Sequence, residues 1–178
     1  EFAEDPVHRL FLAELLSSYT HVASGSLWVQ TPRGWRRRRY SELDPLRLLE
    51  LTQAVPEYER PPLYRRLGDL ALFLTGVFPD YAARRLFLPV QRERLRRAAG
   101  LWDGDQPAGS ESLQSTVSLL EEVGRRAYHL AWKGAESGAT SVLRDLAEGF
   151  GQARRVLNHL TDHYLFAHRS RWFGLPES

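Results

Sequence analysis

Two histidines one helical turn apart, His159 and His163, have the spacing in this sequence that best suits a metal ion. Imidazoles four residues apart on a helix lie on one side of it and can share a ligand. Zinc hydrolases with this spacing also need a glutamate directly after the first histidine, where this chain has Leu160. The helical periodicity turns both histidines toward solvent. We therefore expect no metal and no other cofactor, and keep a metal-dependent enzyme using this pair as an alternative.

A run of four arginines, from Arg36 to Arg39, stands between Trp35 and Tyr40. Arginine binds phosphate groups in a bidentate manner, and aromatic rings stack on unpaired bases. Successive residues of a strand face opposite sides, so four consecutive arginines cannot form one surface. The other interpretation is that the charge protects an exposed sheet edge from aggregation. The binding candidates of this segment are Trp35, Arg36, Arg38 and Tyr40.

Asp69 follows Gly68 at the point where a predicted helix becomes apolar on all sides. A carboxylate in such a place must be paired, or its pKa will rise. The sequence supplies four candidate partners for it: Arg65, Arg66, Arg154 and Arg155. Two interpretations stay open, a structural pair with an arginine and an acid group that lines a pocket for a small molecule.

The elements that must position these residues are mostly helices. Apolar residues at three-to-four spacing predict helices over about 6–22, 45–55, 63–77, 80–86, 90–99, 112–132 and 141–168. The helix over 63–77 is apolar all round from Leu70 onward, which predicts a buried central helix. Two short strands around a Pro/Gly turn predict a minor β-hairpin near 27–40. We expect a mainly α fold, a single-domain bundle of six or seven helices over 3–178 with a loop at about 101–111.

Composition bounds the class of protein. With 178 residues, 43% hydrophobic and 26% charged, the chain has ordinary globular usage and the length of one domain. It contains no cysteine, which excludes disulfides, thiolate metal sites and cysteine nucleophiles. No apolar run reaches the roughly 18 residues of a membrane span, and the acidic N-terminus lacks a signal-peptide layout. We expect a cytoplasmic protein with no membrane partner, and the lack of any methionine suggests a piece of a longer chain.

The stretch from Tyr64 to Pro79 resembles the L-G-D-x-x-L-F-x-x-G-x-F-P segment of a family of uncharacterised helical bacterial proteins, notably from actinobacteria. Gly124 with Tyr128, and the run 153–158, are similar to the later helices of that family. The likeness extends from about residue 11 to residue 166. It implies a helical domain along this whole stretch, brings no activity or cofactor, and directs attention to Asp69 and Gly76.

Local spacing assembles no nucleophile–base pair, metal set or phosphate loop. We therefore predict a non-enzymatic binding domain whose partner is another protein or a second copy of the chain. Trp102, Trp172 and Phe173 fall in predicted loops or the tail, where apolar area often marks an interface. Two alternatives remain: nucleic-acid binding through the Arg36–Arg39 hairpin, and an enzyme that uses Asp69 or the histidine pair.

Overall fold

The computed structural model describes residues 2–19, 24–31, 34–41, 43–84, 89–100, 114–135 and 141–165. Within these residues the chain is mainly helical, and the helices are α1 (Pro6–Ser18), α2 (Pro45–Ala54), α3 (Arg60–Val77), α4 (Pro79–Arg84), α5 (Pro89–Ala98), α6 (Gln114–Gly134) and α7 (Ser141–Leu160). Three short helical turns accompany them: η1 (Phe2–Glu4) before α1, η2 (Glu57–Glu59) between α2 and α3, and the π-helical η3 (Thr161–Leu165) after α7. Two strands, β1 (Ser24–Thr31) and β2 (Gly34–Ser41), form one antiparallel hairpin. The predicted helical bundle with a minor hairpin is therefore confirmed.

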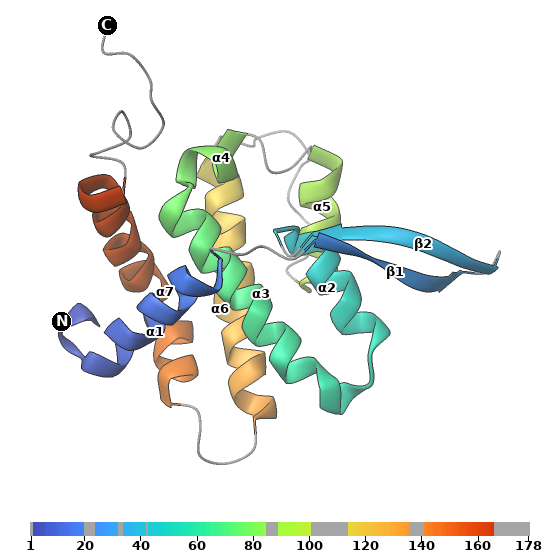
Figure 1. Ribbon diagram of the computed structural model, residues 1–178, viewed down its shortest axis with the longest axis horizontal. Helices are drawn as coiled ribbons and strands as arrows, with labels where there is room; N and C mark the ends of the chain where they lie inside the picture. Colours follow the sequence, from blue (N-terminus) through green and yellow to red (C-terminus); the bar gives the residue numbers. More distant parts are fainter. Residues whose placement is uncertain are drawn as a thin grey trace, which may run out of the picture.

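Helix α3 runs through the middle of the helical body, against α6, α7 and α2 (Figure 1). Every residue from Leu70 to Val77 is buried, which confirms the prediction of a central helix enclosed by its neighbours. The predicted end of this helix at residue 77 is confirmed, and the helix runs through Gly76 without interruption. Gly76 allows α7 to approach closely, since a Cβ at this position would lie 2.7 Å from Cβ of Leu157.

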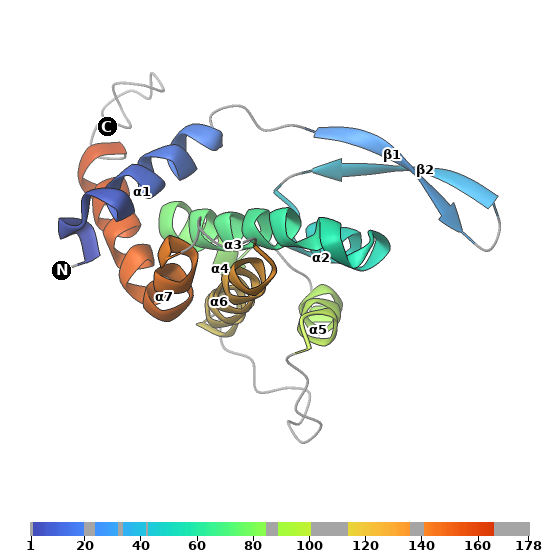
Figure 2. The same ribbon diagram turned by 90° about the horizontal axis from the view of Figure 1, so that it is seen from below.

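The hairpin forms a two-stranded arm that projects away from the helices (Figures 1 and 2). We call residues 24–41 the β-arm. Its strands contact mainly each other, in a register that sets Trp28 opposite Arg37 and Leu27 opposite Arg38. A glycine is required at the start of β2, where Gly34 has a φ of 101°.

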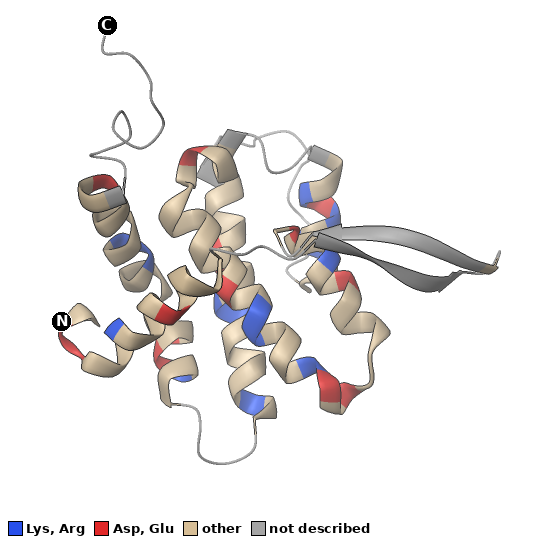
Figure 3. Cartoon of the chain, in the orientation of Figure 1, with Lys and Arg blue, Asp and Glu red and all other residues tan. Residues whose placement is uncertain are grey.

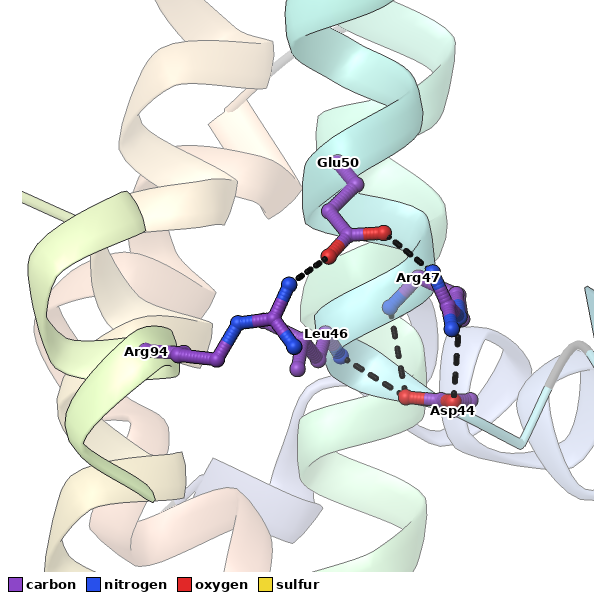
Figure 4. A network of polar contacts seen from close by, with 5 residues as sticks. All are labelled: Asp44, Leu46, Arg47, Glu50 and Arg94. Carbon is purple, nitrogen blue, oxygen red and sulfur yellow. Dashed lines mark hydrogen bonds and ion pairs between the residues drawn. The ribbon is translucent and has the colours of Figure 1, made fainter. Parts of the chain in front are cut away.

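A polar network fixes α2, the helix into which the β-arm leads (Figure 4). Oδ1 of Asp44 accepts hydrogen bonds from the backbone N–H groups of Leu46 and Arg47, at 3.1 and 3.2 Å, and so caps the helix. The carboxylate of Glu50 accepts from Arg47 on the same helix and, at 3.0 Å, from Arg94 on α5. Together these contacts fix the start of α2, directly after the β-arm, and join α2 to α5.

Some predicted boundaries differ from the structure. Helix α1 ends at Ser18, four residues before the predicted end, and the residues that follow it lead into β1. The predicted short helix over 80–86 is α4, over Pro79–Arg84. Trp102, Trp172 and Phe173, on which the interface prediction was based, lie outside the described residues. Of the helices that the structure describes, none combines the length and the apolar character needed to cross a bilayer.

Candidate functional site

Asp69 lies on α3 where this helix faces α6. Its Oδ1 accepts a hydrogen bond of 2.9 Å from the hydroxyl group of Tyr128, which is completely buried. Its Oδ2 is 4.0 Å from Nε of Arg65, one turn earlier on α3. The Asp69 side chain is 14% exposed. The arginine pair expected from the sequence therefore exists, but the tyrosine makes the shorter contact.

The Tyr128 ring packs directly against Gly68, the residue before Asp69. A Cβ at Gly68 would lie 2.7 Å from two carbons of the Tyr128 ring, so only glycine allows the ring to approach α3 this closely. Sequence reasoning did not find this partner, although a buried tyrosine hydroxyl needs one. Its place on the apolar stripe of α6, beside the buried Ala127, is the pattern that could have revealed it.

Burial dominates the electrostatics of this pair. It raises the pKa of Asp69 from 3.8 to about 6, and the hydrogen bond from Tyr128 and the charges of Arg65 and Arg66 only partly oppose that rise. Burial and the adjacent carboxylate together raise the pKa of Tyr128 well above its ordinary value. At neutral pH the tyrosine therefore remains a hydrogen-bond donor to a charged, mostly buried aspartate.

Asp69 also lines a hollow of about 350 Å³ between α1 and α3, which we call the α1–α3 hollow. The side chains around it are those of Phe11, Glu14, Leu15, Ser18, Pro62, Arg65, Arg66 and Asp69. Two acidic side chains and two arginines share this lining, so its formal charges balance. Both interpretations of Asp69 thus hold in part, since it has an arginine partner and it also borders a hollow.

The arginines of this hollow are engaged with their surroundings. The guanidinium of Arg65 lies over the Phe11 ring, 5.8 Å from its centre. That of Arg66 lies over the Tyr19 ring at 4.2 Å and donates to Ser18 Oγ at 3.0 Å. Since Asp69 already has the Tyr128 hydroxyl and the Arg65 guanidinium as partners, the arrangement suits a structural role for this residue.

The other arginines proposed as partners of Asp69 lie on α7. Nε of Arg154 is 3.2 Å from the carboxylate of Glu121 on α6, so the expectation that it could pair with Asp69 was wrong. The side chain of Arg155 is exposed. In the part of the chain described, only Arg65 lies within ion-pair distance of Asp69.

The histidine pair is brought together but lacks further ligands. The ring centres of His159 and His163 are 4.0 Å apart, and Nδ1 of His163 is 2.9 Å from the backbone oxygen of His159. Both side chains are exposed, which confirms the orientation expected from the helical periodicity. Across the described ranges, no group of three or more His, Asp or Glu side chains could hold a metal ion.

The candidates on the β-arm fall on its two faces. The register pairs Trp35 with Gln30, Arg36 with Val29, Arg38 with Leu27 and Tyr40 with Gly25. Because neighbouring positions of a strand alternate between faces, Trp35 falls on the face opposite to the other three candidates. The two-faced distribution expected for four consecutive arginines therefore follows from the register. The side chains of these residues lie outside the described part of the structure.

The sequence matches no protein-family model and no curated protein, and the fold matches no solved structure. The resemblance of residues 64–79 to a bacterial helical family therefore stays a prediction.

Proposed function

We propose that this chain is a non-enzymatic protein-interaction domain, which uses the β-arm to bind an acidic protein surface or a second copy of itself. The observation that carries the proposal is a separation of charge. Residues 24–41 contain five arginines and no acidic residue, a formal charge of +5. The remaining 160 residues contain 19 basic and 22 acidic residues, a formal charge of −3. The projecting element is thus strongly positive, whereas the rest of the chain is mildly negative.

The placement of the β-arm supports this function. An isolated two-stranded hairpin is only marginally stable in water, so an arm that stands clear of its own helices gains from a partner surface (Figure 2). In contrast, both acidic and basic positions occur on the described helices (Figure 3). Opposite charge speeds the encounter of two proteins and selects among partners. Arginine on an open strand edge also discourages unspecific sheet pairing.

Nucleic-acid binding is the second candidate, and the strand register favours it. Trp28 and Trp35 fall on the same face of the arm as Arg37 and Arg39. Alternating aromatic and basic residues on one face suit a single strand, whose bases stack on rings while its phosphates meet arginines.

The test uses two variants with the same change in charge on opposite faces of the arm. One carries Arg36→Glu with Arg38→Glu, and the other carries Arg37→Glu with Arg39→Glu. Sedimentation velocity over a range of protein concentrations measures self-association. Fluorescence titrations with a poly-glutamate peptide and with oligothymidine compare an acidic polypeptide with a single-stranded nucleic acid.

We expect the wild-type chain to self-associate or to bind poly-glutamate, and at least one of the two variants to lose this interaction. Tighter binding of oligothymidine with a steep dependence on salt would instead establish the second candidate. If the wild-type chain stays monomeric and binds neither polymer, the proposed function is wrong.

A further inference from the structure

A second hollow, of about 290 Å³, lies at the other end of α3, between the start of α4 and the last turns of α7 and η3. We call it the α4–η3 hollow. Its lining consists of Gly76, Val77, Phe78, Pro79, Asp80, Tyr81, Asn158, Thr161 and Asp162. Segments some eighty positions apart in the chain therefore form one concave surface.

The negative charge of this hollow is not neutralised by basic residues among the described lining residues. Asp80 and Asp162 are the charged residues among those that line it, and neither lysine, arginine nor histidine is among the described lining residues. Both carboxylates are exposed, and no ion pair reaches either of them from the part of the chain that the structure describes. Figure 3 shows acidic positions on α4 and near the end of α7. The hollow is therefore negative and suits a cation.

An unsatisfied hydroxyl group is the second, independent observation. Thr161 is only 2% exposed, and its Oγ1 has no hydrogen-bond partner among the described residues. Thr75, which is equally buried on α3, donates to the backbone oxygen of Ala71 at 2.7 Å, as a helical threonine usually does. A buried polar atom without a partner is rare in proteins and calls for an explanation, and a bound ligand would supply one.

The wall on the α3 side is held in place by Asn158. With its amide oriented to match its neighbours, Nδ2 donates to the backbone oxygens of Thr75 and Gly76, at 3.2 and 2.9 Å. Because the amide nitrogen is used in this way, the amide oxygen of Asn158 remains as an acceptor. A fixed wall lowers the ordering cost of binding.

Two aromatic rings border the same hollow. Phe78 is 40% exposed and packs edge-on against Phe73, with ring centres 5.5 Å apart. Tyr81 is 48% exposed. The face of an aromatic ring attracts cations, and planar guanidinium groups stack on it.

We propose that the α4–η3 hollow binds a guanidinium group. Such a group is planar, carries five donors and pairs well with carboxylates. The hollow is lined by two aspartates, by two aromatic side chains and by a threonine whose hydroxyl has no partner among the described residues. The group has two possible sources, a free guanidinium compound and an arginine from the β-arm of a second copy. The second source rests on the proposed function; the binding site itself does not.

The first experiment titrates ethylguanidinium into the intact chain by calorimetry, with ethylammonium as the comparison. Saturable millimolar binding is expected, as befits a ligand with few atoms, and ethylguanidinium should bind several-fold tighter than ethylammonium. Asp80→Asn combined with Asp162→Asn should weaken binding at least about tenfold, and Thr161→Val about threefold. Asp69→Asn, in the other hollow, is the control and should leave binding unchanged. Circular dichroism checks that each variant is folded.

Absence of saturable binding up to about 50 mM, or equal binding by the Asp80→Asn/Asp162→Asn variant, would overturn the assignment. Sedimentation of that variant then identifies the source. If its self-association is lost and ethylguanidinium dissociates the wild-type oligomer, the arm supplies the group. If ethylguanidinium binds while self-association is unchanged, the source is a free compound. If the arm variants lose self-association but the hollow binds nothing, the proposed function stands and this inference fails.

Discussion

The acidic residues of the two hollows along α3 differ in their exposure and in their interaction partners. At the α1–α3 hollow, Asp69 is 14% exposed, accepts a hydrogen bond from Tyr128 and has the guanidinium of Arg65 at 4.0 Å. At the α4–η3 hollow, Asp80 and Asp162 are exposed and meet no basic residue among the described lining. Asp69 therefore has interaction partners within the described structure, whereas Asp80 and Asp162 have no basic partner there.

This difference separates a structural acid from a ligand site. A raised pKa in a hollow often points to function, but structural networks raise pKa values as well. Asp69 has the raised pKa and yet has internal partners, so its main effect is on stability. The acids at the far end of the helix show no such network, and a buried hydroxyl stands beside them without a partner. Variants of the first site should therefore change stability, and variants of the second should change binding.

The largest expected effect on stability concerns Asp69 and pH. Its pKa is about 6 in the folded chain and near 3.8 when exposed, so the folded state prefers the neutral acid. The stabilising contribution is fully present below about pH 4 and is lost as pH rises through 6, by about 3 kcal/mol in total. We therefore compare the free energy of unfolding of Asp69→Asn with that of the wild type at each pH. Between pH 4 and pH 7 to 8, this difference should change by about 3 kcal/mol in favour of the variant.

Urea unfolding of both proteins at several pH values between 4 and 8 measures this difference. The asparagine is a suitable comparison, because its amide oxygen still accepts the hydrogen bond from Tyr128. Parallel stability profiles for the two proteins would mean that burial does not raise the pKa of Asp69 as described.

Gly68→Ala should have the next largest effect. The new Cβ would lie 2.7 Å from the Tyr128 ring, which is buried and held by its hydroxyl, so the free energy of unfolding should fall by about 2 kcal/mol. Gly151→Ala is the matched control, since its Cβ would meet only the ends of two long side chains, Glu121 at 3.1 Å and Arg155 at 3.7 Å. Thermal unfolding of both variants should show a loss for the first and little change, or a gain, for the second. Equal losses of stability in the two variants would contradict the close packing of Tyr128 against Gly68.

Tyr128→Phe removes the hydroxyl that donates to Asp69. At pH 8 the carboxylate is left charged and buried without this donor, which should lower the free energy of unfolding by about 1.5 kcal/mol. The loss should be smaller at pH 5, because the neutral acid needs the donor less and the variant raises the pKa of Asp69 further. Denaturant curves at the two pH values test this, and a loss that does not depend on pH would contradict it.

Arg65→Gln should have the smallest effect. The guanidinium is 4.0 Å from Asp69 and its side chain is 51% exposed, so solvent screens the pair and the expected loss is about 0.5 kcal/mol at pH 8. The same denaturant measurement decides it. A loss as large as that of Tyr128→Phe would show that the arginine is the main partner.

Much of the fold follows from local patterns in the sequence. Asp5–Pro6 and Asp44–Pro45 mark the starts of α1 and α2, and in both cases the aspartate caps the helix. The apolar run after Leu70 identifies the buried central helix, because only neighbours on every side can cover such a segment. The hairpin follows from two short strands around a Pro/Gly turn.

The candidate sites could be predicted only in part. Asp69 attracts attention because a charge in an apolar helix is unusual, but its partner Tyr128 lies 59 positions later in the chain. The α4–η3 hollow joins Asp80 to Thr161 through tertiary packing, and no local spacing encodes that. Which arginine faces which acid depends on helix rotation, and for this reason the sequence could not choose among four candidate partners of Asp69, one of which, Arg154, pairs with Glu121.

The contrast between the two hollows is tested most directly by mapping backbone amide chemical shifts while ethylguanidinium is added to the wild-type chain. We expect saturable shifts at Gly76, Thr161 and Asp162, and no such shifts at Gly68 or Asp69. Shifts centred on Gly68 and Asp69, or shifts nowhere in the chain, would contradict the assignment of a structural acid at one end of α3 and a cation site at the other.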